Sequence, residues 1–355
     1  MCAVCAVLAC AGGVVPAAAD TFDYTWSGAY GCAYWTTSTP TDPLYYGNGW
    51  GETWHYTESS DPYYPGAGDS VLVPGGFTLP IQGTGHCGTL TVGEGTMLHD
   101  GKVEIHGGLL DNRGTLALDR SLYVHSPTFD VSGDGTIHLT GPVSTGGGSS
   151  SLYFFGHHCN ATIAADQAVH GVGDIGVANS VVDRRQPNLT NHADIRADAH
   201  DSAPMRIHGW TTCTNDGLLV ASDGATMEIA GHWDNTGGTI RAEDGGVVRF
   251  TATYDTDADG HDDGKIKGGV LEALGDGYFT VTAGKGMVLE ALTLRGQLSV
   301  PAYGAIGASG TVATEAGSSL LISRQTSGSG TGTLYLHGHT TLAGAGATVL
   351  GDGGR

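Results

Sequence analysis

Short alternations of apolar and polar residues run along most of the chain. Between about residue 190 and residue 300 they recur as a unit, Asn-x-Gly-x-(Ile/Leu)-x-Ala, followed by a turn and a second alternating segment. Asn191, Asn215 and Asn235 mark successive copies, so the period is about 20 to 24 residues. Alternation at every second position is typical of β-strands. We therefore expect two or three short strands in each unit. Asn and Gly would occupy the turns, because both tolerate left-handed backbone angles.

A unit of this length cannot bury its own apolar face. Stacking successive units buries it, with each strand paired to its equivalent in the next coil. A sandwich or barrel would give turn signals without a motif repeated at coil length. The pattern therefore predicts an all-β parallel β-helix (β-solenoid) over residues 76–343.

The segments on either side of the predicted coils differ in composition. Residues 20–75 are rich in Trp, Tyr, Pro and Asp, and we interpret them as an N-terminal cap that covers the first coil. A carbohydrate-stacking platform is the alternative for this segment. Residues 344–355 form a Gly-rich run, which we interpret as a tail where the repeat is truncated.

Composition agrees with strands and turns. Gly accounts for 60 of the 355 residues, and Gly is unfavourable inside helices. Acidic residues outnumber basic ones 36 to 15, which gives a formal net charge of −21. Such a surface repels phosphate backbones, so we expect no nucleic-acid partner.

Residues 1–19 are uncharged and mostly small or apolar, and they end in three alanines. This pattern predicts a secretory signal peptide. The stretch is too short and too rich in Gly and Ala for a membrane span. We therefore expect a secreted or cell-surface protein with no membrane span after the signal is removed.

Removal of residues 1–19 would leave four cysteines: Cys32, Cys87, Cys159 and Cys213. An even number in an exported chain favours two disulfides, and proximity in sequence favours Cys32–Cys87 and Cys159–Cys213. Four buried free thiols are the alternative.

Two sequence features carry a resemblance to a known family. One is the opening Tyr24-Thr25-Trp26-Ser27-Gly28, followed by further tryptophans and by Pro-Gly-Ala-Gly-Asp-Ser-Val-Leu-Val at residues 65–73; the other is the Asn-x-Gly repeat. Together they resemble autotransporter-like, adhesin-like exported bacterial β-helix proteins of the type found in planctomycetes, over most of residues 22–300. The resemblance implies a right-handed parallel β-helix on or outside the cell surface, and it specifies architecture rather than activity.

An Asp-rich segment interrupts the repeat at residues 254–265. Carboxylates at alternate positions followed by Gly are suited to a compact calcium loop. The segment resembles the loops of EF-hand-like, dockerin and thrombospondin type 3 repeats. On that pattern, Ca²⁺ would be bound by the side chains of Asp255, Asp257, Asp259 and Asp263 and by the backbone carbonyl of His261. The twelfth position is Ile266 rather than an acid, so the resemblance implies modest affinity; a solvated acidic turn is the alternative.

Several histidines follow apolar strand residues and are predicted to face outward: His106, His125, His138 and His208. Outward rows of histidine can titrate or bind metal weakly, but we interpret them as polar surface positions.

No sequence motif indicates a set of catalytic residues. The chain has no G-x-S-x-G elbow, no Walker loop and no H-E-x-x-H, and its few basic residues are scattered. We therefore expect a non-catalytic structural or adhesive module, with surface glycans or other cell-surface proteins as partners. The alternative is an extracellular polysaccharide lyase or glycoside hydrolase, which would need paired carboxylates on one face of neighbouring coils.

Overall fold

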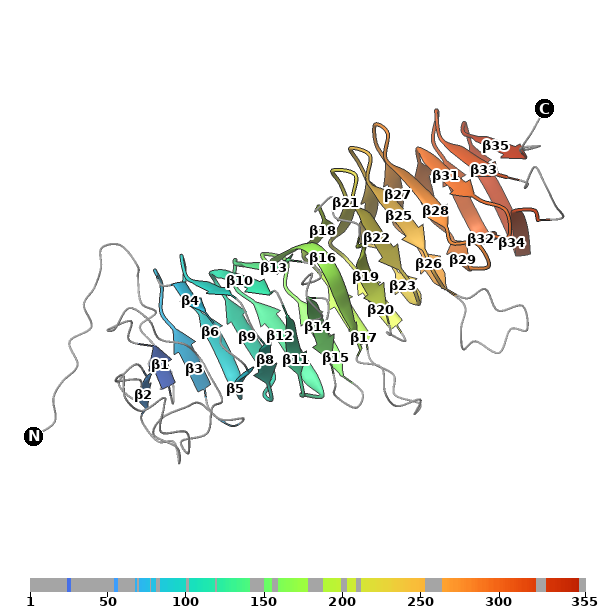
Figure 1. The fold of residues 1–355 in the computed structure, drawn as a ribbon. Helices are drawn as coiled ribbons and strands as arrows, with labels where there is room; N and C mark the ends of the chain where they lie inside the picture. The colour runs from blue at the N-terminus through green and yellow to red at the C-terminus, as the bar shows by residue number, and fades with distance from the viewer. Residues whose placement is uncertain are drawn as a thin grey trace, which may run out of the picture.

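The structure is a computed structural model of the chain. It describes residues 70–76, 84–99, 102–118, 120–140, 150–154, 159–177, 188–198, 203–208, 212–252, 264–323 and 330–350, together with Gly68 and the backbone of residues 24–26, 54–56 and 78–80. This part of the chain is all-β, and its strands stack into a parallel β-helix, as the repeat predicts. Figure 1 shows the coils following one another along an elongated stack from the N-terminal to the C-terminal end.

Each coil contributes one strand to each of three parallel ladders. The first ladder contains β3 (Ser70–Val73), β6 (Thr89–Val92), β9 (Leu109–Asn112), β12 (Thr128–Ser132), β15 (Asn160–Ile163), β17 (Asn188–Asn191), β20 (Thr212–Asn215), β23 (His232–Asp234), β26 (Lys265–Lys267), β29 (Gly286–Glu290) and the first parts of β32 (Ala305–Thr314) and β34 (Thr333–Gly344). The backbone of β1 (Tyr24–Trp26) pairs parallel with β3 and antiparallel with β2 (Trp54–Tyr56).

The second ladder contains β4 (Thr78–Pro80), β7 (Met97–His99), β10 (Thr115–Leu118), β13 (Thr136–Thr140), the first part of β16 (Ala168–Val177), β18 (Asp194–Ala197), β21 (Leu218–Ala221), β24 (Thr239–Ala242), β27 (Val270–Ala273), β30 (Thr293–Arg295) and the second parts of β32 and β34.

The third ladder contains β5 (Thr84–Cys87), β8 (Lys102–Ile105), β11 (Ser121–Val124), β14 (Ser151–Phe154), the second part of β16, β19 (Met205–His208), β22 (Thr226–Ile229), β25 (Val247–Phe250), β28 (Tyr278–Val281), β31 (Gln297–Val300), β33 (Ser319–Ile322) and β35 (Ala347–Leu350). The ladders thus include β3 and β35, so they extend past both of the predicted limits, residues 76 and 343.

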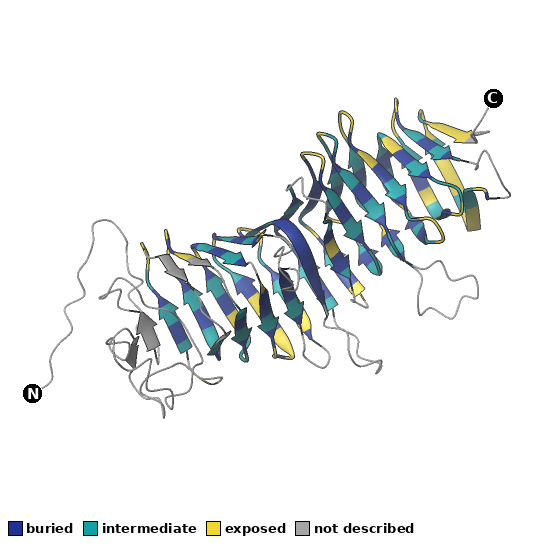
Figure 2. Cartoon of the chain, in the orientation of Figure 1, coloured by how far each residue is buried: buried dark blue, intermediate teal, exposed yellow. Residues whose placement is uncertain are grey.

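The interior is filled by the apolar residues of the alternating pattern. Figure 2 shows buried and partly exposed positions alternating along the strands. Because equivalent strands pair in register, buried side chains form continuous columns, such as the one in the second ladder that contains Leu116, Ile137, Val169, Ile195, Leu219, Ile240, Leu271 and Leu294. Burying each such side chain contributes about 1.5 to 3 kcal/mol, and this burial requires the neighbouring coil.

The asparagines that mark the repeat lie inside the coils. Asn191, Asn215 and Asn235 are 0% exposed, and each amide bonds to the next. Nδ2 of Asn191 donates to Oδ1 of Asn215 at 2.8 Å, and Nδ2 of Asn215 donates to Oδ1 of Asn235 at 2.6 Å. The expectation that these asparagines adopt left-handed backbone angles is wrong, since none of the three has a positive φ. They recur because each must meet its equivalent in the next coil.

Glycines of the repeat leave the space that this asparagine ladder needs. A Cβ at Gly238 would lie 2.4 Å from Nδ2 of Asn215, and one at Gly269 would lie 2.4 Å from Nδ2 of Asn235. A side chain at either position would therefore displace the asparagine of the preceding coil.

The predicted disulfide between Cys159 and Cys213 is absent, because both residues are free thiols. Cys213 pairs in register with Leu189, which pairs with Ala161, two residues after Cys159. Two strand spacings of about 4.8 Å separate the cysteines, whereas bridged Cα atoms lie about 4.4 to 6.8 Å apart. Burial raises the pKa of the Cys159 thiol to about 11 and that of Cys213 well above its usual value, so both thiols are poorly reactive.

Other predictions fall on residues outside the described part of the chain. These are the signal peptide, residues 1–19, most of the cap, residues 20–75, and the Cys32 partner of the buried Cys87. Within the described residues, the chain contains no helix of the length and apolar character required to cross a bilayer.

Candidate functional site on the third ladder

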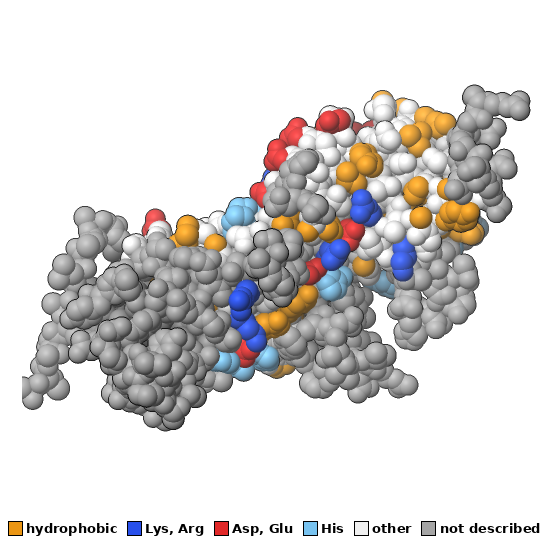
Figure 3. Space-filling view, in the orientation of Figure 1, with side chains coloured by type: hydrophobic (Ala, Val, Ile, Leu, Met, Phe, Trp, Pro, Cys, Tyr) orange, Lys and Arg blue, Asp and Glu red, His pale blue; other side chains and the backbone are white. Residues whose placement is uncertain are grey.

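The third ladder presents a continuous band of polar and aromatic side chains on its outer surface. Figure 3 shows this band crossing the visible face diagonally, with basic, acidic, histidine and apolar side chains in close succession. We define the outer band by eight outward-facing residues from β8 to β25, of which Arg206 is exposed and the others are half-buried or buried: Glu104, Tyr123, Tyr153, Asp174, Arg206, His208, Glu228 and Arg249. Because outward positions alternate with core positions on every strand, the register of the coils fixes the order of these groups.

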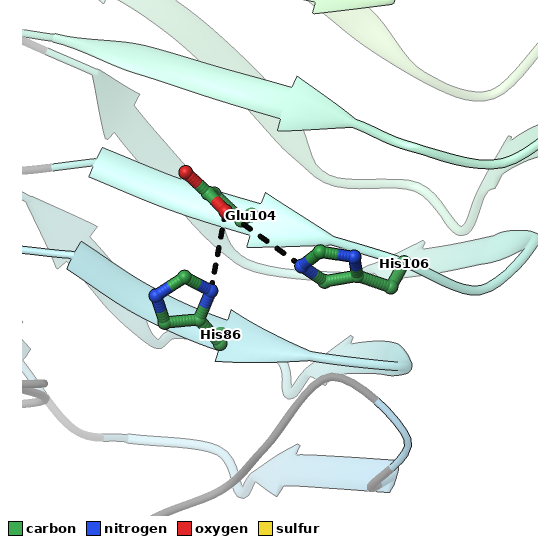
Figure 4. Close-up of side chains that lie close together, drawn as sticks. All are labelled: His86, Glu104 and His106. Carbon is green, nitrogen blue, oxygen red and sulfur yellow. Dashed lines mark ion pairs between the residues drawn. The ribbon is translucent and has the colours of Figure 1, made fainter. Parts of the chain in front are cut away.

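At the N-terminal end of the band, a carboxylate lies between histidines from neighbouring coils. His86 on β5 pairs in register with Glu104 on β8, and His106 follows Glu104 by two residues on the same face. His125, in the next coil, stacks on His106 with ring centroids 4.5 Å apart and ring planes 9° from parallel. Figure 4 shows His86 and His106 turned toward the Glu104 carboxylate. We call these four residues the His–Glu cluster.

The two oxygens of the Glu104 carboxylate have different neighbours. Oε2 lies 3.2 Å from Nδ1 of His86, 3.7 Å from Nε2 of His106 and 3.6 Å from Nε2 of His125. Oε1 instead contacts the ammonium of Lys102, which also lies 4.3 Å from the centroid of the Tyr123 ring. The Glu104 side chain is 15% exposed, so the carboxylate is largely shielded from water.

The charges around Glu104 favour its ionised form. Burial, the largest single influence, raises the pKa of Glu104. The hydrogen bond and charge of Lys102, with the charges of His86 and His125, outweigh burial and lower this pKa overall. The pKa of His125 is lowered, first by burial and then by the charge of His106, so the neutral imidazole is favoured there.

Farther along the band, two tyrosines lead into a chain of charges. Tyr123 and Tyr153 pair in register and stack with ring centroids 6.0 Å apart. The Tyr153 hydroxyl donates to Oδ2 of Asp174 at 3.2 Å. Burial raises the pKa of Tyr153, and the charge of Asp174 adds to this, so the hydroxyl stays protonated as a donor.

The remaining charges of the band are paired across coils. Oδ1 of Asp174 lies 3.6 Å from Nε2 of His208. Arg206, the register partner of Asp174, donates from Nε to Oε2 of Glu228 at 2.9 Å. Arg249 in the following coil donates from Nη1 to Oε1 of Glu228 at 3.1 Å. Each such exposed pair is worth about 0 to 1 kcal/mol, but together they fix the orientation of the outward groups.

The second ladder carries a comparable series of ion pairs: Arg196 with Glu243, Arg241 with Glu272, and Arg295 with Glu272 and Glu315. His138 and His170 stack on the same ladder with ring centroids 4.3 Å apart. These groups alternate in sign along the coils, and they bring together no set of three metal-ligating groups among the described residues.

The predicted sites have different outcomes. His106, His125, His138 and His208 are partly exposed on the outside of their coils, as predicted. The Asp-rich loop residues from Asp255 to Asp263 lie outside the described part of the chain, so the calcium set remains a prediction.

Sequence reasoning missed the contribution of His86 and Glu104. Their separation matches no usual zinc spacing, because it reflects the length of one coil rather than a local turn. The only signal that could have revealed the cluster was the coil register, which places His86 directly beside Glu104.

The fold defines the chain as a parallel β-helix. In the comparisons with known proteins, no family model matches the chain, and no curated protein and no solved structure matches it.

Proposed function

We propose that the chain is a secreted or cell-surface β-helical module with a structural and adhesive role and without catalytic activity. The supporting observation is the continuous register of the three ladders from β3 to β35. Outward side chains at equivalent positions are held about 4.8 Å apart, one coil after another. A surface of this kind presents binding groups on a framework that loses little conformational entropy on binding.

The chemistry of the outer band fits a glycan partner. Tyr123 and Tyr153 are half-buried, and each offers an aromatic ring beside groups that can bond to hydroxyls. Asp174 supplies an acceptor next to these rings, and Arg206 supplies donors in the following coil. A few oriented polar groups beside apolar rings give both contact area and specificity. Surface glycans are therefore the partner that we propose, with other cell-surface proteins as the second class.

A glycan array probed with the whole chain tests this function. We expect binding to a subset of glycans, and we expect the double substitution Tyr123→Ser with Tyr153→Ser to weaken it about tenfold, because each aromatic contact is worth about 0.5 to 1.5 kcal/mol. Tyr335→Ser is the matched control, since Tyr335 is 40% exposed but lies on the first ladder.

Two outcomes of the array would contradict the proposal. An equal loss of glycan affinity in the control and in the double variant would show that binding does not depend on the outer band. Chain cleavage of any bound glycan, detected by mass spectrometry and abolished by Asp174→Ala, would support a polysaccharide-active enzyme instead.

Calcium is part of the proposal for residues 255–263. The structure describes both flanks of the loop: a Cβ at Gly264 would lie 2.1 Å from the Cβ of Ala252, so the two ends meet. A loop that leaves and returns at one point concentrates its carboxylates, and these repel one another unless a cation neutralises them.

Calorimetric titration with Ca²⁺ tests the loop. We expect one site with a dissociation constant of about 10⁻⁴ to 10⁻³ M, as in extracellular modules, and a higher melting temperature in Ca²⁺ than in EDTA. Asp257→Ala should abolish both effects, whereas Asp262→Ala should retain them, because Asp262 is not among the proposed ligands. An absence of heat and of any thermal shift would make the segment a solvated acidic turn.

A further inference from the structure

We propose that the His–Glu cluster is a binding site for a divalent transition-metal ion of the zinc class, with Nδ1 of His86, Oε2 of Glu104 and Nε2 of His106 as ligands. One ligand atom from each of these three residues lies within 4.8 Å of the others. The site is separate from the Asp-rich loop and is independent of the glycan proposal.

The distances suit a small four-coordinate ion. Bonds of about 2.0 to 2.1 Å in a tetrahedron place neighbouring ligand atoms about 3.3 Å apart. Oε2 of Glu104 lies 3.2 Å from the His86 nitrogen and 3.7 Å from the His106 nitrogen. The two imidazole nitrogens lie within 4.8 Å of each other, so side-chain rotations that move them by about 1 Å would seat the ion between the three groups.

An unsatisfied polar atom points to a missing ligand. Nε2 of His106 is buried and has no hydrogen-bond partner, although it faces the Glu104 carboxylate at 3.7 Å. Buried polar atoms are normally paired, and each exception needs an explanation. A metal ion bound by this nitrogen satisfies it directly.

The ligand types select the class of metal. Two imidazoles and one carboxylate oxygen suit Zn²⁺ and its neighbours, whereas Ca²⁺ and Mg²⁺ require more oxygen atoms. Lys102 occupies Oε1 of Glu104, so the carboxylate offers one oxygen and is oriented by its contact with the ammonium.

His125 lies beside the three ligands but is not one of them. Its Nε2 lies 3.6 Å from the same Glu104 oxygen, but its ring stacks parallel to that of His106, so the in-plane lone pairs of the two rings cannot converge on one ion. Three protein ligands leave the fourth position of the tetrahedron to water. The ion would join two consecutive coils, through β5 and through β8 with the residue that follows it, near the N-terminal end of the ladder.

Zinc titration of the whole chain, with excess Ca²⁺ to occupy the Asp-rich loop, tests the site. We expect near-stoichiometric binding of one Zn²⁺ at micromolar protein, and a loss of affinity of about a hundredfold or more in His86→Gln with His106→Gln. His192→Gln with His232→Gln is the control, because it removes two outward histidines elsewhere and should leave binding unchanged.

Two further readouts separate a lost site from a lost fold. The metal-free double variant should melt like the metal-free wild type, and Zn²⁺ should raise the melting temperature of the wild type only. Co²⁺ in place of Zn²⁺ should give the visible absorption of a tetrahedral site in the wild type and not in the double variant. Wild-type affinity in the double variant, or no Zn²⁺ bound by the wild type, would overturn the proposal.

Discussion

Asn215 shows how one polar side chain holds neighbouring coils in register. Its amide accepts from Asn191 and donates to Asn235, and it is 0% exposed. Asn215→Ala would remove the partner of the Asn191 Nδ2 donor in the preceding coil and of the Asn235 Oδ1 acceptor in the following coil. Each unsatisfied buried group costs about 1 to 3 kcal/mol.

We therefore expect Asn215→Ala to lower the free energy of unfolding by at least about 2 kcal/mol, measured by chemical denaturation. Asn188→Ala is the control on β17, because Asn188 bonds to Asn160 at an exposed position, and its loss should cost about 0.5 kcal/mol or less. Equal costs for the two substitutions would show that the interior ladder does not stabilise the stack.

The same residues show what the sequence could and could not predict. Asn191, Asn215 and Asn235 revealed the coil period, because a stacked ladder must repeat once per coil. Their role could not be predicted, because an asparagine in a turn and an asparagine inside a coil recur with the same spacing. Only the burial and the amide bonds distinguish the two.

At the scale of elements, β16 shows a strand that turns from one ladder into the next without a break. Its first part pairs with β13 and its second part with β14. Gly171 makes this possible with φ at 111°, and a Cβ at this position would lie 1.9 Å from the carbonyl oxygen of Leu139. Such a backbone angle is open almost only to glycine.

We expect Gly171→Ala to lower the free energy of unfolding by at least about 2 kcal/mol, through strain and the clash with the neighbouring backbone. Gly176→Ala in the same strand should cost less, since Gly176 lacks a positive φ and a Cβ there would lie 3.0 Å from the ring and the carbonyl oxygen of His208, against 1.9 Å from the Leu139 carbonyl oxygen at Gly171. Thermal unfolding of both variants measures the difference, and a smaller effect at Gly171 would contradict the geometry of the turn.

The alternating pattern predicted which side chains of the strands are buried, as the column from Ile137 to Leu294 shows. It did not predict the His–Glu cluster. That cluster depends on the lengths of the turns between strands, which set the register of His86 beside Glu104. A change of one residue in either turn would move one side chain to the opposite face.

At the scale of the whole molecule, the register determines function as we propose it. The chain carries a net charge of −21, yet the basic groups of the outer band, Arg206 and Arg249, both lie beside Glu228 in the coil between them. The resulting surface is ordered along its length and is acidic overall, which opposes self-association. The Asp-rich loop and the His–Glu cluster would each add a cation to this surface.

The most direct test of this account is a cross-linking measurement of coil register. Thr280 on β28 and Ser299 on β31 are register partners in adjacent coils, about 4.8 Å apart. Arg249 lies one coil farther away, as the partner of Thr280. Under mild oxidation, we expect a disulfide in Thr280→Cys with Ser299→Cys and none in Arg249→Cys with Ser299→Cys, identified by peptide mass spectrometry. A bridge in the second pair, or none in the first, would contradict the stacked register on which the outer band and the metal site both depend.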